Sequence, residues 1–289
     1  MSDKQWYTRT WNYWNGEWIE GNPGIIGPRS HVTWLASSVF DGARFFEGVA
    51  PDLDLHCQRL NKSAKAMGLN PTMKWEEIEA LAWEGAKKFG DKPELYVKPM
   101  YWSEEDGLGM VSPNPDSTCF CLCLFELPMA PADASMTVTK ASYFRPTYDT
   151  MPTNAKAGCL YPNNARIIRE AVSKGFSNAL VCDKLGNIAE TGSSNIFLIK
   201  DGVYKTPVAN GTFLSGITRH RVIDLLKAAG EQVEETTLTY EDFLDADEAF
   251  TTGNYSKVMY VSKIDDVTYK TDKGTRKARE LYWNYAHSK

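Results

Sequence analysis

A stretch near the middle of the chain, residues 126–133, shows no hydrophobic periodicity and carries two prolines, Pro128 and Pro131. Proline fixes its own backbone angle and lacks an N–H donor, so this stretch suits a short stiff connector. Helix and strand patterns lie on both sides of it, and 289 residues leave room for two domains. The sequence predicts a small N-terminal domain over residues 1–125, a linker over 126–135 and a large C-terminal domain over 136–289.

The N-terminal part mixes hairpin, helix and strand patterns. Asn15-Gly16, flanked by Trp14 and Trp18, is typical of a tight hairpin because both central residues must adopt positive φ angles. Apolar residues at helical spacing are followed in two places by glycine, a common residue just beyond a helix. These patterns predict helices over 54–67 and 75–89 and strands over 95–102 and 118–125.

The C-terminal part is dominated by short strands, one pair of which is joined at Asp201-Gly202. The predicted strands span 136–141, 179–183, 195–200, 203–206, 232–238, 248–251 and 258–263, and the predicted helices span 163–174, 217–229 and 276–286. Because hairpins mix with helices without a regular strand–helix alternation, the pattern indicates an α+β protein rather than a Rossmann sheet.

Charge and composition narrow the class of partner. The chain has 32 basic and 37 acidic residues, a net charge of −5, and so lacks a general positive field for nucleic acid or anionic lipid. Its apolar runs fall short of the roughly 18 residues of a membrane span, and its N-terminus lacks a signal-peptide pattern. Six cysteines without a C-x-x-C pair suit a reducing compartment. We expect a cytoplasmic protein that binds small molecules, with no nucleic-acid or membrane partner.

Cys119, Cys121 and Cys123 alternate along a predicted strand, which places their thiols on one face. Buried core cysteine explains this alternation better than a metal site does, since cysteine is among the most buried residue types. The four histidines are dispersed along the chain, which also disfavours a multi-histidine site. We expect no metal ion.

The sequence contains no G-x-G-x-x-G, Walker A, H-E-x-x-H or G-x-S-x-G motif. Lys156 lies among small residues that leave room for a bulky group, and Glu190 precedes a Gly/Ser turn. Gly216-Ile217-Thr218 opens an amphipathic helix, whose first N–H groups can bind an anion. Asn254 lies in a second small polar loop. An amine, a carboxylate and a phosphate cradle are the parts that hold pyridoxal phosphate.

Six segments together resemble the class IV, fold-type IV aminotransferases, and among these the branched-chain amino-acid aminotransferases. They are Phe40-Asp41-Gly42-Ala43-Arg44, Gln58-Arg59-Leu60, Ala155-Lys156-Ala157-Gly158 with Tyr161, Glu190-Thr191-Gly192-Ser193-Ser194-Asn195-Ile196-Phe197, Leu214-Ser215-Gly216-Ile217-Thr218-Arg219 and Thr252-Gly253-Asn254. The resemblance covers nearly the whole chain in order. It implies the two-domain α+β fold of that family, pyridoxal 5′-phosphate as cofactor, and a homodimer or a multiple of dimers.

The resemblance also implies roles for single residues. Lys156 would bind the cofactor covalently and act as general base. Glu190 would pair with the ring nitrogen, and Tyr161 would hydrogen-bond the phenolic oxygen. The implied phosphate-binding residues are Arg59, Gly216, Ile217, Thr218 and Asn254, with Leu214 packed under the ring. The implied substrate-binding residues are Phe40, Gly42, Tyr96, Lys98 and Tyr255.

Two positions depart from the family pattern. Lys98 stands where branched-chain enzymes usually carry arginine, and lysine offers a mobile point charge instead of a planar fork. Asn254 replaces the usual threonine. Aromatic residues near the first segments suggest a bulky apolar pocket, namely Trp34, Phe40, Tyr96, Tyr101 and Trp102. The resemblance thus predicts transfer of an amino group from a branched-chain or other hydrophobic L-amino acid to 2-oxoglutarate by a ping-pong mechanism.

Other functions remain open on the same fold, because a fold does not fix an activity. They are a D-amino-acid transaminase, an (R)-amine transaminase and an aminodeoxychorismate lyase. A tryptophan-rich ligand-binding module is the alternative outside enzymes.

Overall fold

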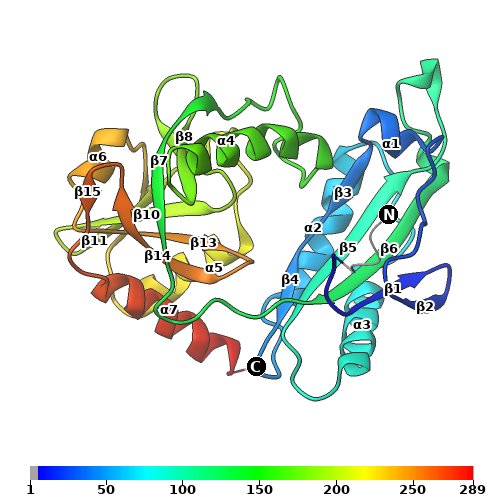
Figure 1. Ribbon diagram of the computed structural model, residues 1–289, viewed down its shortest axis with the longest axis horizontal. Coiled ribbons are helices and arrows are strands. Elements are labelled where there is room, and N and C mark those ends of the chain that lie inside the picture. Colours follow the sequence, from blue (N-terminus) through cyan, green and yellow to red (C-terminus); the bar gives the residue numbers. More distant parts are fainter. Residues whose placement is uncertain (1–5, 289) are drawn as a thin grey trace. The chain divides into compact units, whose positions relative to one another are not determined.

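The computed structural model describes residues 6–288, and the chain divides into two compact units (Figure 1). Unit 1 comprises Met1–Met129 and Ala155–Cys159, and unit 2 comprises Ala130–Asn154 and Leu160–Lys289. Each unit has its own sheet together with helices, so the predicted α+β class is confirmed. The predicted division at 126–135 assigned residues 155–159 to the C-terminal domain, whereas these residues pack with unit 1.

Unit 1 is built on an antiparallel sheet with the strand order β2-β1-β6-β5-β3, and β4 also pairs with β5. Its strands are β1 (Thr10–Trp14), β2 (Glu17–Glu20), β3 (Ser38–Phe40), β4 (Ala43–Phe45), β5 (Leu95–Ser103) and β6 (Thr118–Glu126). Its helices are α1 (His31–Leu35), α2 (Leu53–Ala66) and α3 (Trp75–Ala86), with short 3-10 turns at Lys87–Phe89, Leu108–Met110 and Pro115–Ser117. The predicted hairpin is confirmed, since Asn15 and Gly16 join β1 to β2 with φ angles of 50° and 87°.

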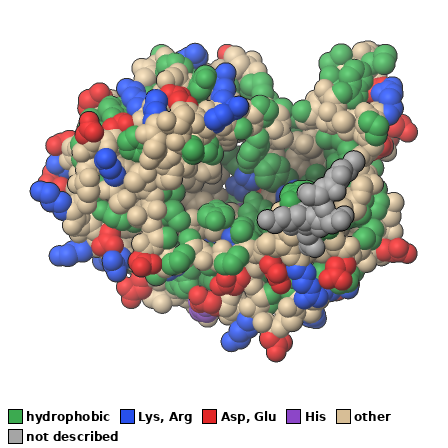
Figure 2. Space-filling model, in the orientation of Figure 1, with side chains coloured by type: hydrophobic (Ala, Val, Ile, Leu, Met, Phe, Trp, Pro, Cys, Tyr) green, Lys and Arg blue, Asp and Glu red, His purple; other side chains and the backbone are tan. Residues whose placement is uncertain are grey.

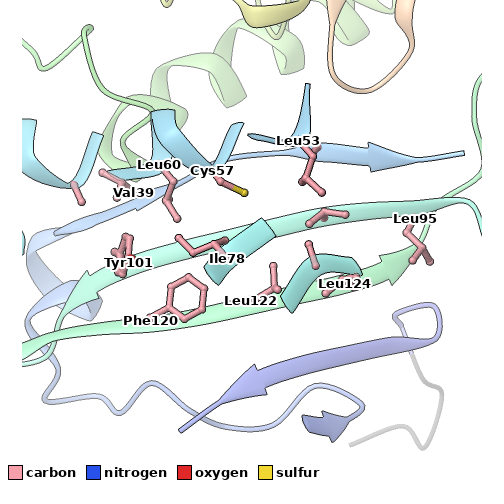
Figure 3. Close-up of a cluster of buried hydrophobic side chains, with 14 of the residues drawn as sticks. Val39, Leu53, Cys57, Leu60, Ile78, Leu95, Tyr101, Phe120, Leu122 and Leu124 are labelled. Atoms are coloured by element: carbon pink, nitrogen blue, oxygen red, sulfur yellow. The ribbon is translucent and has the colours of Figure 1, made fainter. Parts of the chain in front are cut away.

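The core of unit 1 lies between α2, α3 and one face of this sheet (Figure 3). Side chains alternate along a strand, so Leu95, Val97 and Tyr101 of β5 point into the core. Tyr96 and Lys98, between them in sequence, lie on the opposite face and are half-buried. The helices therefore cover one face of the sheet, and the other face carries Tyr96 and Lys98.

Unit 2 contains a mixed sheet with the order β12-β11-β10-β13-β14-β7-β8-β9, and β15 pairs with β14. Its strands are β7 (Ser135–Phe144), β8 (Asn178–Cys182), β9 (Ile188–Thr191), β10 (Asn195–Lys200), β11 (Val203–Pro207), β12 (Val233–Thr236), β13 (Glu248–Gly253), β14 (Lys257–Ile264) and β15 (Val267–Thr268). Its helices are α4 (Tyr161–Ser173), α5 (Ile217–Ala228), α6 (Tyr240–Leu244) and α7 (Lys273–Ala286), and a 3-10 turn at Gly158–Leu160 precedes α4. Strand β7 runs parallel to both β8 and β14.

The surface in view in Figure 2 carries acidic and basic side chains interspersed with each other. Hydrophobic side chains gather at its upper right, over the loop between β5 and β6, where Leu108, Met110 and Val111 are exposed. Among residues 6–288, no helix combines the length and the apolar character that crossing a membrane requires.

Candidate active-site residues

Both backbone groups of Lys156, the N–H and the carbonyl, form hydrogen bonds within unit 1. Its N–H donates to Ser63 Oγ of α2 at 3.1 Å, and its carbonyl accepts from the Phe40 N–H at 3.1 Å. Next to it, Ala157 pairs with Val39 of β3 in an isolated antiparallel bridge. The neighbours Ala155 and Ala157 are fully buried, but the Lys156 side chain is half-buried, with Nζ 5.1 Å from the centre of the Phe40 ring. The structure therefore fixes the position of the main chain that carries this amine.

Arg59 is oriented by a buried carboxylate, Asp41. Arg59 Nε donates to Asp41 Oδ2 at 2.7 Å and Nη2 donates to Oδ1 at 2.9 Å, while His56 Nδ1 lies 2.7 Å from Oδ1. Burial alone would raise the pKa of Asp41, but the charges of Arg59 and His56 outweigh it and hold that pKa well below its ordinary range. A bidentate pair of this kind restricts how the guanidinium can point. The Gly42 N–H also donates to Asp41 Oδ1, at 2.7 Å.

The sheet face opposite the helices brings together four of the five predicted substrate residues. A Cβ at Gly42 would lie 2.2 Å from the Tyr96 hydroxyl, so only glycine fits against this tyrosine. The Tyr96 ring stacks on Phe125 with a centroid distance of 5.2 Å. Lys98 is two residues further along β5, on the same face and opposite Cys123. Phe40 pairs with Met100, two residues beyond Lys98. This face, which we call the β5 face, carries the rings of Phe40, Tyr96 and Phe125 together with the side chain of Lys98.

Glu190 lies on β9 in unit 2 and is buried, with a different partner at each carboxylate oxygen. Arg145 Nη2 is 3.2 Å from Oε1, and Asn195 Nδ2 donates to Oε2 at 3.2 Å. Arg145 is in turn anchored by Nε to the Thr212 carbonyl at 3.2 Å and by Nη1 to Asn164 Oδ1 at 2.7 Å. The carboxylate is thus fixed in one orientation beside a buried cation.

Helix α5 begins after Gly216, which caps it without a side-chain hydrogen bond. A Cβ at Gly216 would lie 2.2 Å from Asn195 Oδ1, so the helix start packs directly against the residue that holds Glu190. Asn195 Nδ2 also donates to the Leu214 carbonyl at 3.2 Å, which fixes the segment before the helix. The N–H groups of Ile217 and Thr218 belong to the first turn, where helices leave their backbone donors without intrahelical partners. This start can therefore bind an anion.

The turn between β13 and β14 adds further donors to unit 2. Thr252, on β13, pairs with Asn195 of β10. Thr252 Oγ1 and Asn254 Nδ2 are both buried and hydrogen-bond to no residue in the described part of the chain. Asn254 Oδ1 accepts from Lys257 Nζ at 2.8 Å. Because buried polar groups normally have partners, the two unmatched groups indicate a polar ligand at this turn.

The two remaining predicted residues are more exposed. Tyr161 is the first residue of α4, and Tyr255 lies in the β13–β14 turn with 57% of its surface accessible. The predicted set therefore falls into two groups. Lys156, Arg59 and the β5 face belong to unit 1, whereas unit 2 carries Glu190, Tyr161, Tyr255, the start of α5 and Asn254.

Sequence reasoning missed the residues that hold these groups in place. Asp41, Arg145, Asn195 and Lys257 contact predicted residues, yet no sequence motif indicated a role for any of them. Asp41 and Asn195 lie inside the segments that carry the resemblance, so proximity in sequence was a signal for them. Arg145 and Lys257 lie outside those segments, and only the fold reveals their contacts.

Over residues 6–288, the structure shows no cluster of three or more histidine, cysteine, aspartate or glutamate side chains placed to bind a metal ion. All six cysteines fall in this range and none forms a disulfide. Cys121 is buried beside Asn12, and burial raises its pKa to about 12. Burial also raises the pKa of Cys123, although Lys98 counteracts that rise.

Comparisons with known proteins agree with these features. The family model described as amino-transferase class IV matches residues 38–264. A probable branched-chain-amino-acid aminotransferase of Rickettsia bellii is 30% identical over 256 residues, 88% of each chain. A crystal structure of an aminotransferase from Brucella abortus, bound to the cofactor PLP, is 54% identical with a TM-score of 0.95, covering 96% of this chain and 99% of that one. The branched-chain aminotransferase of the archaeon Thermoproteus uzoniensis, crystallised with norvaline, is 25% identical with a TM-score of 0.87, covering 97% and 95%.

Proposed function

Because this chain belongs to the class IV aminotransferase family and has the fold-type IV architecture that its residues predicted, we propose that it transfers amino groups between hydrophobic L-amino acids and 2-oxoglutarate. The prediction of an aminotransferase related to the branched-chain enzymes is confirmed at the level of the family. The donor, in this proposal, is a branched-chain or similar hydrophobic L-amino acid.

The observation that carries the choice of substrates is the β5 face. Phe40, Tyr96 and Phe125 offer an apolar, aromatic surface, which suits a branched aliphatic side chain. Lys98 adds an ammonium group to that face, and we assign it to the side-chain carboxylate of 2-oxoglutarate or glutamate. A single site can then accept an apolar side chain in one half-reaction and an acidic one in the other.

Pyridoxal 5′-phosphate is the cofactor in this proposal, and the residues of unit 2 fit it. The first-turn N–H groups of α5 have no partner within the helix. Thr252 of β13 and Asn254 of the β13–β14 turn each have a buried polar group without a partner in the described chain. We assign the phosphate to the Ile217 and Thr218 amides after Gly216, to Asn254, and to Arg59 of unit 1.

The remaining cofactor contacts are those that the family resemblance implies. When bound, pyridoxal phosphate supplies an electron sink for the charge that develops at the substrate's Cα. Glu190, held beside Arg145, would pair with the ring nitrogen and keep it protonated. Tyr161 would donate to the phenolic oxygen, and Leu214 would pack against the ring.

Lys156 is the catalytic residue. Its Nζ would hold the cofactor, and as a free amine it would take the proton from the substrate's Cα. Its main chain stays fixed through Ser63 and Phe40, so only the side chain has to move. Gly42 leaves room for the Tyr96 hydroxyl on the β5 face. We assign Gly42, Tyr96 and Tyr255 of the β13–β14 turn to the substrate.

Donor and acceptor use the same residues in turn, so the kinetics are ping-pong. We further propose a homodimer, which would cover the exposed apolar loop at Leu108, Met110 and Val111. Six unbridged cysteines fit a cytoplasmic enzyme.

A panel of amino donors tests the proposed function. Purified enzyme is assayed with L-leucine, D-leucine, D-alanine, an (R)-configured arylalkyl amine and aminodeoxychorismate, with 2-oxoglutarate as acceptor where one is needed. We expect L-leucine to give the highest kcat/KM and parallel lines in double-reciprocal plots. The Lys156→Ala variant should show no turnover. Preference for a D-amino acid or an (R)-amine, or release of pyruvate from aminodeoxychorismate, would replace the proposed donor class.

A further inference from the structure

Lys257 is a buried cation in an unusual backbone conformation. It is the first residue of β14, only 1% of its surface is accessible, and it pairs with Gly253 across the β13–β14 turn. Its φ angle is 61°, in the left-handed region that residues with a side chain enter at a cost of about 1 kcal/mol. Lysine is rarely buried to this extent. Both the strain and the buried charge need a compensating role, and such features concentrate at functional sites.

The contact between Lys257 and Asn254 determines which way the asparagine amide points. Lys257 Nζ donates to Asn254 Oδ1 at 2.8 Å, and it also lies 5.8 Å from the centre of the Tyr282 ring. A lysine ammonium can only donate hydrogen bonds, so it must face the oxygen of the amide and not the nitrogen. The Nδ2 group, a donor, is therefore turned away from Lys257.

The freed donor has no acceptor in the described chain. Asn254 Nδ2 is buried without a hydrogen-bond partner among residues 6–288, and so is the hydroxyl of Thr252, a residue with 1% of its surface accessible. Thr252 pairs with Asn195, which itself packs against Gly216 at the start of α5. Two unmatched side-chain donors and the N–H groups of a helix start thus belong to connected parts of unit 2. A group that only accepts hydrogen bonds and carries negative charge would satisfy all of them.

We propose that Lys257 is a positioning residue, which holds the Asn254 amide with Nδ2 as donor to the cofactor phosphate; this role rests on the proposed function. A threonine at position 254, the usual residue in the family, has a hydroxyl that can rotate to donate. An asparagine can instead present either its oxygen or its nitrogen to the phosphate, and the oxygen would repel it. Lys257 removes that ambiguity and adds a buried positive charge next to the anion.

The affinity of the full-length protein for pyridoxal phosphate and for pyridoxal tests this role. The ratio of the two dissociation constants isolates the contribution of the phosphate, independently of any activity. In Lys257→Met we expect the preference for the phosphorylated compound to fall by about tenfold, as for a lost charge-assisted hydrogen bond, with the affinity for pyridoxal unchanged. Lys263→Met, on the same strand, is the control and should keep the wild-type ratio. Lys257→Arg keeps a cation that can only donate hydrogen bonds, and it should retain most of the wild-type preference for pyridoxal phosphate over pyridoxal.

A double-mutant cycle shows whether Lys257 acts through Asn254. Asn254→Ala should lower the ratio by a similar factor, and Asn254→Ala combined with Lys257→Met should lower it little further, because both changes remove the same donor. Strictly multiplicative effects, or a Lys257→Met ratio within twofold of wild type, would overturn the proposal. Equal weakening of both ligands in Lys257→Met and Lys257→Arg would indicate a structural role and also overturn it. Failure of the wild-type protein to bind pyridoxal phosphate would instead contradict the proposed function itself.

Discussion

Arg145 and Glu190 form a buried ion pair, with Nη2 3.2 Å from Oε1, and Arg145 is anchored on its other side to Asn164 and Thr212. Breaking a buried pair leaves an uncompensated charge, which disfavours the ionised carboxylate. We expect Arg145→Met to lower kcat with L-leucine about tenfold or more, since tenfold corresponds to only about 1.4 kcal/mol. Arg145→Lys keeps the positive charge but loses the planar fork of the guanidinium, so its kcat should lie between those of wild type and Arg145→Met. A kcat for Arg145→Met within a factor of two of wild type would refute the importance of this pair.

Asp41 makes the stability of unit 1 depend on pH in the acidic range. Because its pKa is lowered in the folded protein, its stabilising contribution is complete above the unfolded value of about 4 and is lost as the pH falls below it. We expect Asp41→Asn to cost about 3 kcal/mol at pH 7 and to lose part of the acid dependence. Urea denaturation at pH 7 and at pH 3 measures both effects. Asp133→Asn, at an exposed position, is the control.

Lys98 should distinguish acidic from apolar oxo acids. Lys98→Met removes one ammonium group from the β5 face and leaves its aromatic rings, so KM for 2-oxoglutarate should rise about tenfold. KM for 4-methyl-2-oxopentanoate, which lacks the second carboxylate, should change little. Steady-state kinetics with both acceptors make the comparison. Equal increases for the two acceptors would mean that Lys98 binds the carboxylate they share.

Gly216 should tolerate no side chain. A Cβ there would lie 2.2 Å from Asn195 Oδ1, and Asn195 Nδ2 is bonded to Glu190 and to the Leu214 carbonyl. We expect Gly216→Ala to cost about 1–3 kcal/mol of stability through overpacking and to weaken binding of pyridoxal phosphate. Thermal denaturation and a cofactor titration report the two effects. Gly24→Ala, at a site with no neighbour within 4 Å of the added Cβ, should leave both unchanged.

The cysteines should react slowly in the folded protein. Burial raises the pKa of all six, to about 12 for Cys121, so little thiolate forms near neutral pH. Mass spectrometry after iodoacetamide treatment at pH 8 should show labelling at least about tenfold slower than in urea, where thiols have pKa values near 8.5. Fast labelling of Cys121 under native conditions would contradict its burial.

Long elements and turn chemistry were predictable from the sequence, because their signals are local. The helices α2 and α3, the strands β5 and β6 and the Asn15-Gly16 turn all follow from periodicity or from backbone preference. Six of the elements of two to five residues were missed, namely β3, β4, β9, β15, α1 and α6. So few residues do not complete a periodic pattern, and pairing with neighbouring strands decides their conformation.

The residues of the candidate site were predictable from the sequence, but the residues that hydrogen-bond to them and hold them in place were not. Lys156 and Glu190 stand in recognisable segments, and the structure places both on well-anchored backbone. The partners of these residues come from distant parts of the chain: Ser63 precedes Lys156 by 93 positions, and Thr212 follows Arg145 by 67. Contacts of this kind arise from tertiary packing and leave no local trace in the sequence.

Unit 1 is assembled from two separate pieces of the polypeptide, because Ala155–Cys159 joins Met1–Met129. A fragment that stops at residue 129 would lack Ala155 and Ala157 from its interior and would be missing the reactive amine altogether. Exchanging unit 1 between related enzymes therefore requires transfer of the five residues Ala155–Cys159 together with Met1–Met129. During synthesis on the ribosome, unit 1 likewise stays incomplete until residue 159 has left the exit tunnel.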